Sequence, residues 1–118
     1  MLSMKKKEED PEYVGKRMNK QSENGLAWCT LDYRFTYHIE DKDKLKVEER
    51  DECLKGMVEG IQKFWKETSL GTLLLMNEED IAGELEFLAK KFSNDLLTIQ
   101  IDEDMIHYQC KDERGFDF

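Results

Sequence analysis

Hydrophobic and polar residues alternate along residues 26–39, so that every second side chain shares a face. One face holds the apolar and aromatic positions Ala27, Cys29, Leu31, Tyr33, Phe35, Tyr37 and Ile39. The residues between them are mainly polar, and the segment is rich in aromatic residues and threonine. A period of two with this composition predicts one long, half-buried β-strand.

From residue 47 to residue 68 the apolar residues recur instead at steps of three and four. They are Leu54, Met57, Val58, Ile61, Phe64 and Trp65, and they predict an amphipathic helix. Gly56 and Gly60 lie within it, and each costs up to about 1 kcal/mol of helix propensity relative to alanine. We expect this cost to be offset by a close approach of the helix to the sheet.

A second helix is predicted from Asn77 to Phe92, because Asn77 is a good N-cap and acidic residues follow it at the positive end of the helix. Residues 72–76 are a short apolar run that fits either a buried strand or a packed connector. Residues 96–101 and 105–110 alternate again, which predicts a hairpin joined through Asp102, Glu103 and Asp104.

The predicted order of elements is therefore β-α-(β)-α-β-β. It indicates an α+β, two-layer sandwich with a three- or four-stranded, mainly antiparallel sheet and two helices on one face. A chain of 118 residues is long enough for one hydrophobic core. Residues 1–25 are polar and read as a flexible tail, which leaves residues 26–118 as a single acidic domain.

Charge narrows the classes of partner. The chain holds 27 acidic and 18 basic residues, a formal net charge of −9, and residues 26–118 hold 22 acidic against 12 basic. Affinity for nucleic acid comes largely from Lys and Arg that displace counterions, so we expect no direct binding to nucleic acid. A protein with a basic surface is the expected partner.

Two further features bear on location. No apolar run approaches the roughly 18–20 residues that span a bilayer, so no membrane association is expected. Cys29, Cys53 and Cys110 are an odd number without the spacing of a disulfide framework. We therefore expect free thiols and a cytoplasmic location.

No residue pattern predicts catalysis, a cofactor or a metal site. His107 and Cys110 are three apart on a strand and point to opposite faces, which does not suit chelation of one ion. Cys29 and Cys110 fall on the inner face, where cysteine packs as a small hydrophobic residue. The acidic runs lie at turns and helix ends, where solvent keeps carboxylates ionised, and we expect a protein that is not an enzyme.

The outer face of the sheet is the candidate partner-binding surface. It would present Trp28, Arg34, Thr36, His38, Met105 and His107. Trp, Arg and Met are enriched at the centres of interfaces, although an ordinary solvated face would also be rich in Thr and Gln. The leading hypothesis is a small acidic regulator, inhibitor or immunity-type factor that binds another macromolecule, for example by occupying a nucleic-acid groove on its partner.

Two alternatives remain. The chain could be a small-ligand-binding or enzymatic domain with a pocket between sheet and helices, lined by Tyr33, Tyr37, Tyr108 and Trp65. It could also form a homodimer through the open sheet face or an unpaired edge strand.

Overall fold

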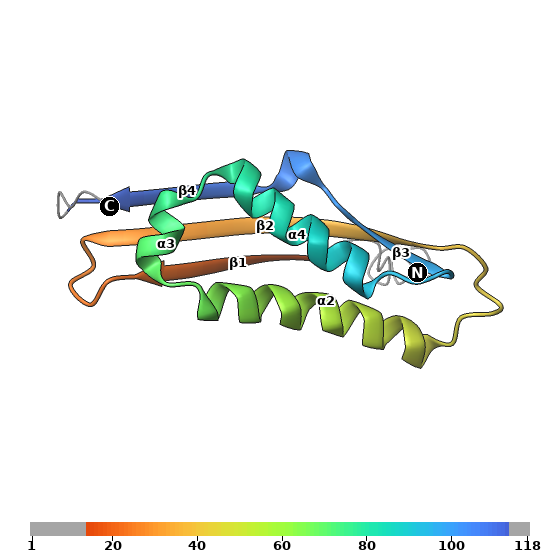
Figure 1. Cartoon of the computed structure of the whole chain (residues 1–118). Coiled ribbons are helices and arrows are strands. Elements are labelled where there is room, and N and C mark those ends of the chain that lie inside the picture. Colours follow the sequence, from red (N-terminus) through yellow and green to blue (C-terminus); the bar gives the residue numbers. More distant parts are fainter. Residues whose placement is uncertain (1–13, 114–118) are drawn as a thin grey trace, which may run out of the picture.

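The computed structural model describes residues 14–113. The strands are β1 (Val14–Gln21), β2 (Ala27–Ile39), β3 (Leu97–Ile101) and β4 (His107–Asp112), and the helices are α2 (Val47–Glu67), α3 (Leu70–Leu75) and α4 (Glu78–Phe92). A single 3-10 turn, η1 (Glu103–Met105), separates β3 from β4. The strands form one antiparallel sheet and the helices the second layer (Figure 1), so the predicted α+β sandwich is confirmed.

β2 is the centre of the sheet, because every other described strand pairs with it. β1 runs along one side of β2, from Trp28 to Phe35. Along the other side, β3 pairs with residues 35–39 and β4 pairs with residues 27–32. β3 and β4 therefore lie end to end on the same edge of β2 (Figure 1).

The predicted hairpin of residues 96–101 and 105–110 is wrong for this reason. The linking residues form η1, in which the Met105 N–H donates to the Asp102 carbonyl oxygen at 2.9 Å. This turn interrupts the edge strand without reversing it. With 13 residues, β2 is long enough to pair with both pieces in succession.

The expected tail, residues 1–25, contains β1, so residues 14–21 of that range are a strand; residues 1–13 lie outside the described part. Asn24 and Gly25 form the turn between β1 and β2, where Gly25 has φ +74°. That left-handed conformation favours glycine. The turn is closed by the Ser22 N–H, which donates to the Ala27 carbonyl oxygen at 2.8 Å.

The core lies between the inner face of the sheet and the helices. Alternate residues of β2 are buried, as the period of two predicted. All three described helices contribute buried side chains: Met57, Ile61 and Trp65 from α2, Leu73 from α3, and Ile81, Leu85 and Ala89 from α4. Residues 70–75, which include most of the undecided apolar run, are helical.

The glycines of α2 serve helix packing and not an approach to the sheet. A Cβ atom built on Gly56 would lie 2.6 Å from the ring of Phe92, and one on Gly60 would lie 3.1 Å from Leu88. Both contacts are with α4. The close approach predicted from the two glycines therefore exists, but its partner is the second long helix.

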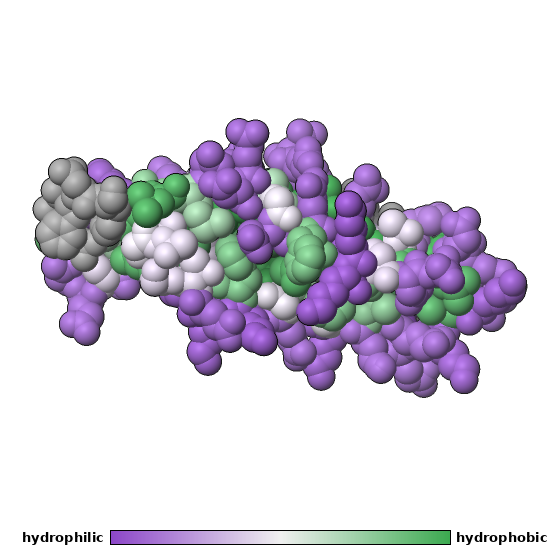
Figure 2. Space-filling model, viewed as in Figure 1, coloured by the Kyte–Doolittle hydropathy of each residue, from purple (hydrophilic) through white to green (hydrophobic). Residues whose placement is uncertain are grey.

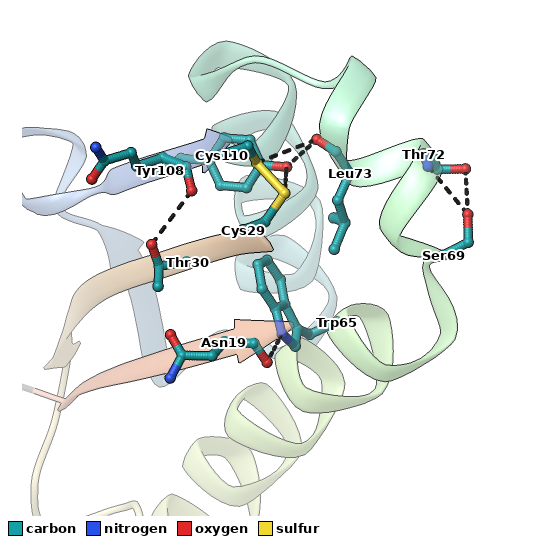
Figure 3. The surroundings of a disulfide bond; sticks show 10 residues. Asn19, Cys29, Thr30, Trp65, Ser69, Thr72, Leu73, Tyr108 and Cys110 are labelled. Atoms are coloured by element: carbon teal, nitrogen blue, oxygen red, sulfur yellow. Dashed lines mark hydrogen bonds between the residues drawn. A yellow bond between two sulfur atoms is a disulfide. The ribbon is translucent and has the colours of Figure 1, made fainter. Parts of the chain in front are cut away.

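Cys29 and Cys110 form a disulfide (Figure 3). They are directly opposite each other in the β2–β4 register, and Cys29 is fully buried. The prediction of three free thiols is therefore wrong for these two, because the sequence did not show that the two strands are neighbours in this register. Cys53 is free.

Candidate functional site

The outer sheet face, the side of the sheet turned away from the core, is covered by no described helix. The register sets its side chains in cross-strand rows: Gln21, Trp28 and Lys111; Asn19, Thr30 and Gln109; Arg17, Asp32 and His107; Gly15 and Arg34; Thr36 and Gln100; His38 and Thr98. Five of the six predicted site residues lie here. Met105 lies in η1 and not on a strand, because β4 begins only at His107.

The outer sheet face is close to charge balance. Arg17 holds Asp32 through two contacts, Nε–Oδ1 at 2.7 Å and Nη2–Oδ2 at 2.9 Å, and the hydrogen bond from Arg17 lowers the pKa of the Asp32 carboxyl. Arg34 Nη2 lies 3.0 Å from Asp102 Oδ2. Lys111 Nζ lies 3.1 Å from Glu113 Oε2. The net charge of −9 is therefore not located on this face.

One cluster of carboxylates lies where α4 and η1 meet. Two acidic runs that are far apart in the chain, Glu78–Glu79 and Glu103–Asp104, line one hollow of about 470 Å³. Its lining is Glu78, Glu79, Ala82, Gly83, Glu86, Glu103, Asp104 and Ile106. Five of these eight residues carry a carboxylate, and no described Lys or Arg lines the hollow.

Two of these carboxylates, Glu86 and Glu103, are close enough to interact. A hydrogen bond with Glu86 raises the pKa of Glu103, and the negative charge of Glu86 raises it further. The like charge of Glu86 therefore disfavours ionisation of Glu103. A cation placed between them would relieve this repulsion.

A second hollow of about 730 Å³ continues this surface around the edge of β3. Glu86, Glu103 and Asp104 line both hollows, and the second also includes Thr36 and Gln100 from the outer sheet face. Lys90 is its one basic described lining residue. We call the joined surface the acidic groove and define it by Glu78, Glu79, Glu86, Asp102, Glu103 and Asp104.

Sequence reasoning missed the acidic groove because it treated each acidic run as a separate solvated segment. One signal was present. Glu79 and Glu86 are seven apart, so they share one side of α4. What the sequence did not reveal is that η1 lies against that side.

The residues proposed for an internal pocket are mostly core. Trp65 donates its Nε1–H to the Asn19 carbonyl oxygen at 3.0 Å and packs edge-to-face on Tyr108, with 6.4 Å between ring centroids (Figure 3). The Tyr108 hydroxyl donates to the Leu73 carbonyl oxygen, and Tyr33 is buried. Of the four, only Tyr37 lines a cavity described below, between the end of β2 and the start of α2.

Side chains that could bind a metal ion are not brought together in the described part of the chain. Within residues 14–113, no three His, Cys, Asp or Glu side chains are arranged to hold a metal ion. Burial raises the pKa of the Cys53 thiol, and Glu52 and Glu49 raise it further, which disfavours the nucleophilic thiolate.

None of the three described helices could span a bilayer, since α2 is heavily charged and α3 and α4 are short. Comparison with known protein families, curated proteins and solved structures found no match to this chain.

Proposed function

We propose that the protein is a non-enzymatic interaction protein, a regulator, inhibitor or immunity-type factor, that binds another protein with a basic surface. The observation that carries this proposal is the convergence of two acidic runs into the acidic groove. Basic side chains of the partner would enter the groove, and the adjoining outer sheet face would extend the contact through Thr36 and Arg34.

Charge distribution supports a partner of this chemistry. The negative charges of Glu86 and Glu103 repel each other, and a lysine or arginine of the partner would relieve this repulsion. Complementary charge also speeds association, and its effect falls as salt screens it. The same carboxylates would repel the phosphates of single- or double-stranded nucleic acid, which argues for a protein partner.

The test is to immobilise the protein and capture its partner from an extract of the source cells. The same capture is repeated with a groove variant that combines Glu86→Lys and Glu103→Lys. A control variant combines Glu59→Lys and Glu67→Lys on α2, which changes net charge equally outside the groove. We expect a stoichiometric partner that the wild type and the control retain, that the groove variant loses, and that elutes as salt is raised.

Two results would contradict the proposal: no stoichiometric macromolecular partner, or a partner retained equally by the groove variant. Sedimentation of the purified protein tests the separate possibility of a homodimer. If the only species captured is a second copy of the chain, the function as a regulator of another protein is wrong.

Location is a separate proposal, because the expected cytoplasmic placement relied on free thiols. Disulfides persist mainly in oxidising compartments, so the Cys29–Cys110 bond favours such a compartment. Acid quenching of cells followed by alkylation tests this. Alkylation of Cys53 alone supports an oxidising compartment, whereas alkylation of all three cysteines supports the cytoplasm.

A further inference from the structure

A cavity of about 420 Å³ lies where β2 ends and α2 begins, away from the acidic groove. It is lined by Tyr37, His38, Ile39, Lys42, Leu45, Lys46, Val47 and Arg50. No residue is common to this cavity and the acidic groove. Its volume is within the range of about 300–1,000 Å³ that small-molecule sites occupy.

The charge of this cavity is opposite to that of the chain. Lys42, Lys46 and Arg50 line it, and none of the described Asp or Glu residues does, although acidic residues outnumber basic ones in the protein by 27 to 18. Arg50 is partly neutralised by Asp51, 3.1 Å away. Neither Lys42 nor Lys46 makes an ion pair within residues 14–113, so two ammonium groups remain available.

Acidic residues are close in sequence, but none of them lines the cavity. Glu49 Oε1 accepts from the Lys46 backbone N–H at 3.0 Å, and Asp41 Oδ1 accepts from the Asp43 N–H at 3.0 Å. Glu40 lies 4.0 Å from the ring of His38. These carboxylates reduce the local positive potential without entering the lining.

The rest of the lining is apolar. Tyr37 is buried, Ile39 and Leu45 are half-buried, and Val47 is 57% exposed. Figure 2 shows hydrophobic surface among hydrophilic side chains at this end of the molecule, on the right of the view, where Figure 1 shows the chain passing from β2 to α2. An exposed valine beside a lysine-lined cavity suits a ligand with one charged end and one apolar end.

We propose that this cavity binds a small amphiphile with an anionic head, carboxylate or phosphate, and an apolar body. Lys42 and Lys46 hold the head, and Tyr37, Ile39, Leu45 and Val47 contact the body. The proposal is independent of the partner protein, because the two surfaces share no residue.

The test uses three probes with the same ten-carbon chain: decanoate, decanol and decyltrimethylammonium, below their micelle concentrations. Binding is measured by calorimetry and by NMR shifts of the backbone amides of residues 37–50. We expect decanoate to bind more tightly than decanol and the cation not to bind. Decyl phosphate in place of decanoate identifies which anionic head is preferred.

Two double variants distinguish binding in the cavity from attraction of the anion to any surface lysine. Lys42→Gln with Lys46→Gln should weaken decanoate binding about tenfold, as the loss of two exposed charge contacts implies. Lys55→Gln with Lys63→Gln, exposed lysines on α2 outside the cavity, should change it less than twofold. Equal weakening by both variants, or equal binding of all three probes, would overturn the proposal.

Vesicles distinguish a free amphiphile from a membrane surface. Neutral phosphatidylcholine vesicles and vesicles that also contain phosphatidylglycerol are offered to the wild type. Binding of anionic vesicles without binding of free decanoate or decyl phosphate would assign the lysines to a lipid surface and refute a small-molecule cavity.

Discussion

Lys20 of β1 should be one of the most important polar residues for stability, although it lies in a segment that resembles a tail. Its ammonium group donates to the carbonyl oxygens of Trp65 at 2.7 Å and Lys66 at 3.1 Å, and to that of Thr68 at 2.5 Å. The last four carbonyls of a helix have no partner within the helix. Lys20 satisfies two of these for α2 and fastens β1 to the helical layer.

The expected loss of stability on removing the Lys20 ammonium group follows from these contacts. Hydrogen bonds to a charged group contribute about 1.5–3 kcal/mol, and a cation at a helix C-terminus typically about 0.3–1 kcal/mol within the same interaction. Because Lys20 is half-buried, we expect Lys20→Met to lower the free energy of unfolding by about 2 kcal/mol, or the melting temperature by about 8 °C. Methionine keeps the aliphatic stem, so the loss reports on the ammonium group.

The assay is urea denaturation followed by far-ultraviolet circular dichroism, with Lys16→Met as the matched control. Lys16 lies on the same face of β1, is exposed and makes no ion pair among residues 14–113, so its replacement should change stability by less than about 0.5 kcal/mol. Amide exchange along β1 should quicken only in Lys20→Met. If the two variants agree within 0.5 kcal/mol, the capping role is refuted.

Four other outcomes are expected. Tyr33→Phe should raise stability by about 1 kcal/mol in thermal melts, because the Tyr33 hydroxyl is buried without a hydrogen-bond partner in the described chain; a loss of stability would show that it has one. Glu103→Gln should raise stability at pH 7 but not below about pH 4, where the wild-type carboxyl is also protonated. Because the pKa of Glu103 is raised by folding, the wild type loses stability as the pH rises through that pKa. A gain in stability that does not depend on pH would contradict this reasoning. Gly83→Ala should stabilise the protein by up to about 1 kcal/mol, because no other atom lies near the added methyl group. Gly56→Ala should destabilise it by about 1 kcal/mol, because its methyl group would clash with Phe92 of α4. Equal effects of the two substitutions in urea titrations would refute the packing argument. Reduction of the β2–β4 disulfide, which closes a loop of 81 residues, should lower stability by about 4 kcal/mol in titrations with and without dithiothreitol, and an unchanged midpoint would show that the bond does not constrain the unfolded chain.

The elements that the sequence predicted well are those with an uninterrupted period. β2, α2 and α4 each carry a full apolar face, so their type follows from spacing alone. β1 lacks that signal because two of its inner-face positions are Lys16 and Lys20, and the pattern reads as polar. Asn24-Gly25 was the available evidence for a hairpin, since this pair favours the turn between two adjacent strands.

The pairing of β3 and β4 with β2 and the location of the acidic groove could not be predicted from spacing. Alternation in residues 96–101 and 105–110 is equally compatible with a hairpin and with one interrupted edge strand. Only the length of β2 and the turn at Met105 decide between them. The acidic groove likewise depends on which side of α4 meets η1, which is a tertiary contact with no local signature.

The central place of β2 has a consequence during synthesis on the ribosome. β1 and β2 are joined by a short turn and can pair as soon as residue 35 has emerged. The other side of β2 waits for β3, whose first residue, Leu97, is made roughly 3–12 s later at about 5–20 residues per second. During that interval the nascent hairpin exposes an unpaired, aromatic-rich edge, the kind of edge that recruits strands from other chains. We expect this waiting period, more than the stability of the finished domain, to determine how much of the protein aggregates when it is made quickly.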